Sequence, residues 1–463
     1  FRESGKPIIA YADNYSQGAY YLASVADKIY LNPSGMSTLT GLTLNTLFFK
    51  DLLDKTGIEV QLIRHGKFKA AAEQFISNKM SEENREQLSA YINSVWDSWT
   101  IAISESRGIS VEKINLLVDN LDLANAQDAL DAGLVDDLLY KDELTENLVN
   151  LFGAKDEKGL KIISSTAYSR ATKKTDFKQK NKIAVLYANG DIIMGKSSEN
   201  IASDTYQELI SKVRKDSTIK AVVLRINSPG GSAQSSDIIE RELALLKEVK
   251  PLVVSMGDYA ASGGYWIASN ADKIYTTNAT LTGSIGVFSM VINGQKALNK
   301  HLRVYSTSVN TNSHSDLMNG YRPLDNKEVA FIQSTVEDIY TDFVKLVSKG
   351  RSMTSDRVDS VGQGRIWSGS DAIRIGLADE RGGLIDAINS AASMAGLEGW
   401  RIVEYPVIKS QMDKILETIS NTENSARVLS SPELLLERAY ESLKKESGIK
   451  TLARVPYNVE IAL

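Results

Sequence analysis

Ser262 is the residue whose surroundings best suit a nucleophile. It follows Ala261 and precedes Gly263 and Gly264, and such small neighbours let a substrate backbone come close. The apolar run before it predicts a strand, and a helix is expected to begin near Ser262. A helix N-terminus offers free N–H groups and the positive end of the helix dipole, which suit an oxyanion. A serine at this junction is equally typical of a structural N-cap, so the local pattern leaves both interpretations open.

A serine nucleophile needs a base, and the sequence offers two kinds. The histidines are His65, His301 and His314, and a Ser-His-Asp triad would have to use one of them. His301 opens a strand-like run and His314 lies in a polar loop, so both are typical of surface residues. The other base is a lysine, which must be desolvated so that it is neutral. Lys67 and Lys69 are the candidates, with solvated surface charges as the alternative interpretation.

Two glycines are candidates for an oxyanion hole. The N–H of Gly263 directly follows the nucleophile, and Gly231 lies just past the end of a predicted strand. Ligands of open α/β sheets bind at the carboxyl ends of the strands, where such N–H groups can stabilise a developing negative charge.

An internal repeat covers most of the chain. Residues 20–30 return as 265–275, which is 245 positions later. The same match continues with an offset of 243 to 245 for residues 96–99 and 128–136. This period is far longer than the roughly 20–50 residues of solenoid repeats, so it indicates a domain duplication.

The two copies differ at the residues that chemistry needs. Gln17 stands in the first copy where Ser262 stands in the second. Conversely, residues 311–315 of the second copy contain no lysine where the first copy has Lys67 and Lys69. A dyad split between the copies predicts this complementary loss, and it requires a site formed within one chain or between two chains.

The elements that must position these residues alternate between strand and helix. This alternation favours a mainly parallel α/β sheet. Expected strands cover 182–188, 221–226 and 251–256, and expected helices cover 203–214, 235–248 and 329–347.

The repeat also suggests a domain organisation. We expect an N-terminal repeat domain at 1–152 that carries the lysine, a linker at 153–181, and a C-terminal repeat domain at 182–400 that carries the serine. The first copy has no counterpart of residues 182–250, so it is expected to lack its start. A C-terminal extension at 401–463 begins with a strand-like piece at 401–407, and helices follow, including 432–445.

Composition excludes several classes of protein. The net charge of −5 gives no global basic field for nucleic acid. The absence of cysteine among the 463 residues excludes disulfides and thiolate metal sites. No apolar run approaches the ~18 residues of a membrane span.

Several motifs together resemble the signal peptide peptidase A family, in its long, duplicated bacterial form (peptidase family S49). Residues 257–266, Gly-Asp-Tyr-Ala-Ala-Ser-Gly-Gly-Tyr-Trp, resemble the family's nucleophile motif. Residues 66–70, Gly-Lys-Phe-Lys-Ala, are similar to its lysine motif. Residues 227–232 and 281–286 resemble its flanking motifs, and 365–369 resemble its C-terminal signature. The resemblance spans about residues 5–400.

The resemblance implies a serine protease with a Ser-Lys dyad on two tandem Clp-protease/crotonase-like ββα-spiral domains. Ser262 would attack the carbonyl, neutral Lys69 would take its proton, Gly231 and Gly263 would hold the oxyanion, and Ser284 would support Lys69. The family cleaves remnant signal peptides on the outer side of the bacterial inner membrane, and it assembles as a bowl-shaped tetramer. The resemblance thus implies an N-terminal anchor that this chain does not include. Neither a cofactor, a metal nor a nucleic-acid partner is expected.

Two other functions remain open at this stage. A crotonase-type acyl-CoA enzyme also uses paired backbone N–H groups but needs no serine nucleophile, and an inactive assembly scaffold would use Ser262 only as a cap. The split between Ser262 and Lys69 argues against the first of these.

Overall fold

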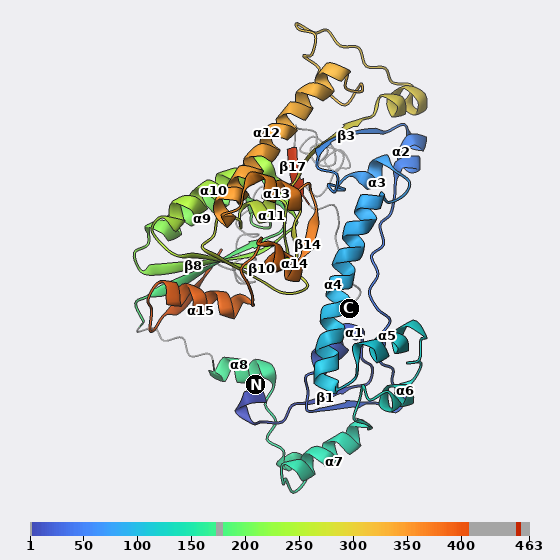
Figure 1. Ribbon diagram of the computed structural model, residues 1–463, viewed down its shortest axis with the longest axis vertical. Coiled ribbons are helices and arrows are strands. Elements are labelled where there is room, and N and C mark those ends of the chain that lie inside the picture. The colour runs from blue at the N-terminus through green and yellow to red at the C-terminus, as the bar shows by residue number, and fades with distance from the viewer. Residues whose placement is uncertain (1, 173–178, 407–450, 455–463) are drawn as a thin grey trace, which may run out of the picture. The chain divides into compact units, whose positions relative to one another are not determined.

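The protein consists of two compact units in a computed structural model that describes residues 2–172, 179–406 and 451–454 (Figure 1). The first unit is built from residues 2–45 and 92–172. The second is built from residues 46–91, 179–406 and 451–454. The units therefore do not follow the repeat boundary, because residues 46–91 come from the first copy of the repeat but pack in the second unit.

A mainly parallel sheet forms the centre of the second unit. Its path runs β14-β12-β10-β8-β5-β16, and β11 and β15 extend it beside β10. All of its pairs are parallel except β12 with β14. The strands are β5 (Lys182–Asn189), β8 (Ile219–Ser228), β10 (Leu252–Ala261), β11 (Lys273–Thr276), β12 (Leu281–Gly283), β14 (Ile366–Ser368), β15 (Glu380–Arg381) and β16 (Arg401–Tyr405).

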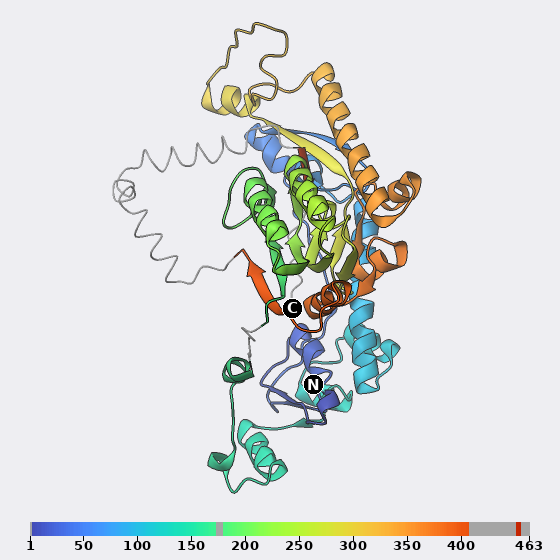
Figure 2. The same cartoon turned by 90° about the vertical axis from the view of Figure 1, so that its left-hand side faces the viewer.

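Helices cover both faces of this sheet, as Figures 1 and 2 show. Along β5, Ile183 and Val185 pack with helix α15, whereas Ala184 and Leu186 pack with α9 and α10. Successive residues of a strand point to opposite faces, so an unbroken apolar run is what a strand buried on both sides requires. The helices are α9 (Ser203–Lys215), α10 (Ala233–Lys247), α13 (Ser355–Val361), α14 (Gly369–Ile375) and α15 (Leu384–Met394).

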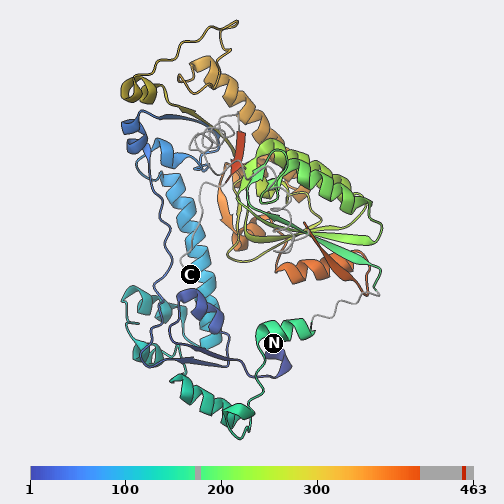
Figure 3. The ribbon, with the colours of Figure 1, turned by 180° about the vertical axis from the view of Figure 1, so that it is seen from behind.

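A second sheet of this unit joins segments that are far apart in the sequence. Its order is β3-β13-β17-β9-β6-β7. The first-copy strand β3 and the second-copy strand β13 pair antiparallel over seven residues, and they lie side by side in Figure 3. The strands are β3 (Glu59–His65), β6 (Ile192–Ile193), β7 (Ile201–Ala202), β9 (Gly230–Ser232), β13 (Val287–Asn293) and β17 (Thr451–Arg454).

The predicted long helix at 329–347 is present as α12 (Asn326–Arg351). His301 does not open a strand as expected, because residues Ala297–Leu302 form a helical turn. The turn is closed by Arg303 at a φ of 57°. Short helices α2 (Lys50–Thr56) and α3 (Glu73–Ile76) flank β3 in sequence, and α4 covers Glu82–Arg107.

The first unit has a small parallel sheet in the order β1-β2-β4. Its core gathers residues such as Tyr20, Ile29 and Ile114, which are fully buried. The strands are β1 (Ile9–Ala12), β2 (Lys28–Leu31) and β4 (Asp137–Leu138), and the helices include α1 (Gln17–Ala23), α5 (Val111–Asp119), α6 (Ala126–Asp131), α7 (Lys141–Leu151) and α8 (Ser165–Thr172).

The two copies of the repeat make the same internal hydrogen bonds. A buried tyrosine hydroxyl donates to a leucine carbonyl in each copy, and an isoleucine N–H donates to an aspartate. The bonds are Tyr20 Oη to Leu134 O (2.8 Å) and Tyr265 Oη to Leu377 O (2.8 Å), with Ile29 N to Asp136 Oδ2 (2.8 Å) and Ile274 N to Asp379 Oδ2 (2.7 Å). Matching side chains therefore fix matching parts of each copy.

The expected strand at 401–407 is present as β16 (Arg401–Tyr405). The expected helices beyond it, including 432–445, lie outside the described residues. Within the part of the chain that the structure describes, none of the helices combines the length and the apolar character that crossing a membrane requires.

Candidate active site

Strand register places Ser262 beside Ser284. In the parallel pair β10 and β12, Ala261 lies opposite Gly283. The next residues of the two strands are Ser262 and Ser284, and the N–H of Ser262 donates to the carbonyl of Gly283 at 2.8 Å. Two serines thus leave the carboxyl ends of neighbouring parallel strands at the same level.

Ser262 does not act as a side-chain cap of the helix that it precedes. Helix α11 (Gly263–Trp266) has no capping hydrogen bond from the Ser262 side chain. The backbone of Ser262 has φ 56° and ψ −119°, a combination that non-glycine residues rarely adopt and that is strained. A serine held on a strained strand-to-helix turn is typical of a nucleophile elbow, so the geometry favours the functional interpretation over the N-cap.

Antiparallel pairing brings Lys69 to the two serines. His65 at the end of β3 lies opposite Val287 at the start of β13. Because the strands run in opposite directions, the chain that follows His65 meets the chain that precedes Val287. This is how Lys69 reaches Ser284, 215 positions later in the sequence, and all of these residues belong to one chain and one unit.

Lys69 is buried and has three polar neighbours. Its Nζ lies 2.7 Å from Ser262 Oγ and 3.0 Å from both the hydroxyl and the carbonyl oxygen of Ser284. Only 1% of Lys69 is exposed, and Ser262 is fully buried. This burial lowers the pKa of Lys69 well below its usual range, because the charged form loses its hydration.

A neutral amine at Lys69 would fit each of these three polar contacts. A neutral amine has two N–H donors and one lone pair. In that form the two donors would serve the oxygens of Ser284, and the lone pair would be free to accept the Ser262 hydroxyl proton. Among the described residues, Lys69 has no carboxylate within ion-pair distance that would stabilise the charged form.

Gly263 directly follows Ser262, and Gly231 lies in a strand that packs against the same short helix. Gly263 is the first residue of α11, so its N–H belongs to the free donors of a helix start. Gly231 lies in β9, and a Cβ there would come within 2.1 Å of the Ile192 carbonyl oxygen. Only glycine therefore permits β9 to approach β6 this closely.

The first copy carries no equivalent site at Gln17. Its side chain is buried, donates to the Gly41 carbonyl at 3.0 Å and accepts from the Thr40 N–H at 3.3 Å. Gln17 thus ties down a loop of the first unit, which is a structural role.

Among the described residues, no histidine is hydrogen-bonded to Ser262. The ring of His65 stacks on Tyr340 with centroids 3.7 Å apart, and its Nδ1 lies 2.5 Å from Glu337 Oε2. His301 is exposed. Lys67, the other lysine candidate, is also exposed and lies over the Phe68 ring at 5.0 Å.

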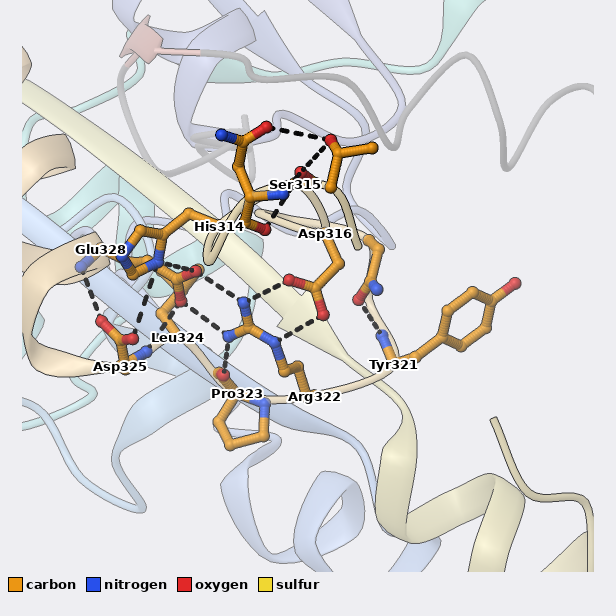
Figure 4. A network of polar contacts seen from close by, with 12 residues as sticks. His314, Ser315, Asp316, Tyr321, Arg322, Pro323, Leu324, Asp325 and Glu328 are labelled. Carbon is orange, nitrogen blue, oxygen red and sulfur yellow. Dashed lines mark hydrogen bonds and ion pairs between the residues drawn. The ribbon is translucent and has the colours of Figure 1, made fainter. Parts of the chain in front are cut away.

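His314 belongs to an ion network at the start of α12 (Figure 4). The His314 Nδ1 lies 3.0 Å from Glu328 Oε1 and 3.7 Å from Asp325 Oδ2. The guanidinium of Arg322 donates to both oxygens of Glu328, at 2.6 and 2.7 Å, and also to Asp316. These carboxylates have the ligand types of a metal site, but Arg322 already neutralises Glu328. The cluster links residues 314–322 to the first turn of α12.

The sequence did not predict where the motif at 365–369 lies relative to Lys69. The loop between β3 and α3 (residues 66–72) carries Lys69 and is called the lysine loop below. The segment that leads into β14 runs beside this loop, and Gln87 is hydrogen-bonded to both. The Gln87 side chain donates to the Phe68 carbonyl at 3.0 Å and accepts the Ile366 N–H at 3.1 Å. Gln87 lies in an ordinary helical stretch, so no local pattern marks it.

Comparison with known proteins agrees with this fold. The family model described as peptidase family S49 matches residues 1–155 and again residues 244–398. This double match defines an α/β protein with two copies of a peptidase domain, and it confirms the predicted tandem duplication. The chain belongs to peptidase family S49, as the motif resemblance predicts.

Several of its relatives carry protease names. It is 36% identical to "Protease 4" of Haemophilus influenzae, over 97% of this chain and 75% of that protein. It is 34% identical to "Serine protease SPPA, chloroplastic" of Arabidopsis thaliana, over 86% of this chain and 60% of that protein. It is 34% identical to "Putative signal peptide peptidase SppA" of Enterococcus faecium, over 48% of this chain and 67% of that protein.

Among solved structures, a mutant of ClpP1 from Listeria monocytogenes is similar, with a TM-score of 0.31 and 12% identity. The match covers 44% of this chain and 94% of that one.

Proposed function

We propose that this protease is a serine endopeptidase that uses Ser262 and Lys69 as a catalytic dyad. The observation that carries the proposal is the 2.7 Å contact between Lys69 Nζ and Ser262 Oγ in a buried site. A buried lysine whose pKa is lowered is neutral over more of the pH range, and only a neutral amine can accept a proton.

The proposed reaction has two halves. Ser262 Oγ attacks the scissile carbonyl carbon while Lys69 Nζ takes the hydroxyl proton, and the N–H groups of Gly231 and Gly263 stabilise the oxyanion. The C–N bond then breaks as Lys69 returns the proton to the leaving amine. Water attacks the acyl-enzyme with Lys69 again as base, and the second product leaves Ser262 free. Ser284 holds the amine in place through two contacts.

Extended peptides are the proposed substrates. Beside the site, β17 lies between β9 and β13 and pairs antiparallel with both. Ala453 of β17 lies opposite Gly231, so β17 itself is an extended segment held by its backbone between these two edges, and the proposed peptide would bind there in place of β17. A peptide bound in this way depends little on its side chains, which suits varied apolar sequences such as signal peptides. The name of the Enterococcus faecium relative supports the same substrate class.

Location and assembly stay predictions from the motif resemblance. We propose that the protein works at the bacterial inner membrane, on its outer side, and that it assembles as a tetramer. Measuring the mass of the purified protein by analytical ultracentrifugation tests the assembly, and a monomeric mass would contradict it.

The decisive experiment compares peptide hydrolysis by the wild type, Ser262→Ala and Lys69→Ala, with Lys67→Ala as the control. Loss of a dyad member should lower kcat by at least about 10³-fold, while the exposed neighbour Lys67 should be dispensable. The wild-type rate should rise with pH as Lys69 loses its proton. A fluorophosphonate probe should label the wild type at Ser262 and leave Ser262→Ala unlabelled.

Two outcomes would contradict the proposal. Full activity in Ser262→Ala would exclude this serine as the nucleophile. Turnover of a CoA thioester without probe labelling would favour the acyl-CoA alternative.

A further inference from the structure

The segment 363–365 is hydrogen-bonded to two loops of the proposed active site. One is the lysine loop, and the other joins β12 to β13 (residues 284–286) and is called the Ser284 loop. The Gln363 carbonyl accepts the N–H of Phe68 at 2.9 Å. The N–H of Gly364 donates to the Ile285 carbonyl at 2.7 Å, and the Arg365 carbonyl accepts the N–H of Ser284, also at 2.7 Å. Three consecutive residues thus link the lysine loop to the Ser284 loop through backbone hydrogen bonds.

Gly364 lies directly against the backbone of Lys69. Its φ is +78°, and a Cβ at this position would lie 2.6 Å from Lys69 Cβ and 2.6 Å from Lys69 N. Real Cβ atoms do not approach other heavy atoms this closely, and the obstacle here includes backbone. A side chain at position 364 would therefore force the lysine loop to move.

Two further glycines allow the same close approach. A Cβ at Gly66 would meet the carbonyl carbon of Gln363 at 2.4 Å, and a Cβ at Gly286 would meet Gly364 Cα at 2.7 Å. The lysine loop, the Ser284 loop and segment 363–365 consequently touch backbone to backbone. Backbone contacts leave less freedom than contacts between long side chains, which can change rotamer.

Tyr340 holds the segment from its other side. The N–H of Gln363 donates to Tyr340 Oη at 3.2 Å, and Tyr340 Oη donates to Asp359 at 2.6 Å. Gln363 itself has a φ of +52°, so an unfavourable backbone conformation is stabilised next to the lysine loop.

We propose that Gly364 is a positioning residue, which sets the place of Lys69 relative to Ser262 and Ser284 by direct backbone contact. The inference rests on the proposed function, because it assigns a role through the Lys69 amine. Lysine has four flexible methylene groups, so its Nζ is held at three oxygens only if its backbone is fixed. Displacing a catalytic group by about 1 Å can lower a rate about 100-fold.

The test compares Gly364→Ala with Gly376→Ala in the full-length chain. Gly376 has a similar φ of +89°, but its nearest neighbour for a Cβ is Met353 Sδ at 3.8 Å, so it matches the backbone strain without touching the site. Gly364→Ala is expected to lower kcat about 100-fold, and KM should change little because the lysine does not bind the substrate. The rise of the rate with pH should also move to higher pH, since a displaced lysine regains water and holds its proton more tightly. Gly376→Ala should keep the wild-type rate and pH profile.

A second variant decides the matter if Gly364→Ala does not fold. Tyr340→Phe removes the hydroxyl that holds Gln363 without adding an atom, and it is expected to lower kcat about tenfold with the same shift of the pH profile. A folded Gly364→Ala with the wild-type kcat and profile overturns the proposal, and so does an unchanged Tyr340→Phe when Gly364→Ala is unfolded.

Lys69→Ala in the same assay separates the proposed function from the positioning role of Gly364. If it stays active, the proposed function fails, whereas an inactive Lys69→Ala beside a normal Gly364→Ala defeats only the positioning role.

Discussion

At the scale of single residues, the proposed site depends on a lysine whose charged form is disfavoured by burial. Among the described residues, the polar partners of the Lys69 amine are serine oxygens alone, and its burial disfavours the ammonium form. The same desolvation that suits Lys69 to a base should therefore reduce the stability of the fold at neutral pH.

We predict that Lys69→Met abolishes hydrolysis but stabilises the protein at pH 7. The unfolded lysine binds a proton up to its usual pKa of 10.5, whereas the folded one, with its lowered pKa, does not. The unfolded state thus binds more protons, so wild-type stability rises with pH between the lowered pKa and 10.5. Methionine has a similar length and no proton to bind.

Urea unfolding of both proteins at pH 7 and pH 10 measures this effect. The stability advantage of the methionine variant should be larger at pH 7 and shrink by pH 10. An advantage of equal size at both values, or none, would show that desolvation of Lys69 does not carry the effect.

At the scale of elements, strand register does the positioning. The pair β10 and β12 aligns Ser262 with Ser284, and the pair β3 and β13 brings in Lys69. Helix α12 packs along β3 and β13. The contacts that fix its N-terminus therefore also support the sheet that positions Lys69.

We predict that Glu328→Gln destabilises the fold in a pH-dependent way. Glu328 is 2% exposed, and hydrogen bonds from Arg322 lower its pKa to about 2. Removing this charge should cost about 2 kcal/mol at pH 7, as for a hydrogen bond to a charged group. The contribution is fully present above the usual pKa of 4.5 and is lost as pH falls toward about 2.

Chemical unfolding at pH 7 and pH 3 tests this expectation. The difference between wild type and variant should be smaller at pH 3. Asp342→Asn is the control, because its pair with Lys345 lies on the same helix but is exposed. A variant as stable as wild type at pH 7 would mean that the network does not anchor α12.

At the scale of the whole molecule, the two copies of the duplication have taken different roles. Residues 46–91 of the first copy have joined the second unit and supply Lys69, while Gln17 replaces the serine in the first unit. Both residues of the proposed dyad therefore meet within one chain, so a partner chain is not needed to bring them together.

We predict that Ser262→Ala and Lys69→Ala chains do not complement each other. The two chains would be co-expressed with different tags and purified through both, so that only mixed assemblies are assayed. Peptide hydrolysis should stay at the level of either inactive variant, since no chain holds both residues. A wild-type chain purified with Ser262→Ala is the control for activity in a mixed assembly, and activity recovered in the double-variant mixture would place the dyad between chains.

The sequence was informative wherever a residue's type or its repeat position constrained the chemistry. The small residues around Ser262 predicted close access for a substrate backbone, and the apolar run of 182–188 predicted a strand of the parallel sheet. The repeat singled out Ser262 and the segment with Lys67 and Lys69, because the other copy lacks the serine or the lysines, and the motif resemblance then selected Lys69. Such patterns are local, or they compare one segment with its own copy, so they can be recognised in one dimension.

Other features depended on which distant segments come together. Gln87 and Gly364 carry no local signal, and their contacts with the lysine loop follow from the pairing of β3 with β13 and of β12 with β14. The strand-like run at His301 pairs with no neighbouring strand among the described residues, and it is largely exposed, so an apolar local pattern alone did not make it a strand. The sequence by itself thus determined which residues are candidates for catalysis and that they are divided between two copies of a repeat. Only the tertiary structure decided that both meet in one chain and that Lys69 is buried, because strand register and burial are properties of the packed chain as a whole.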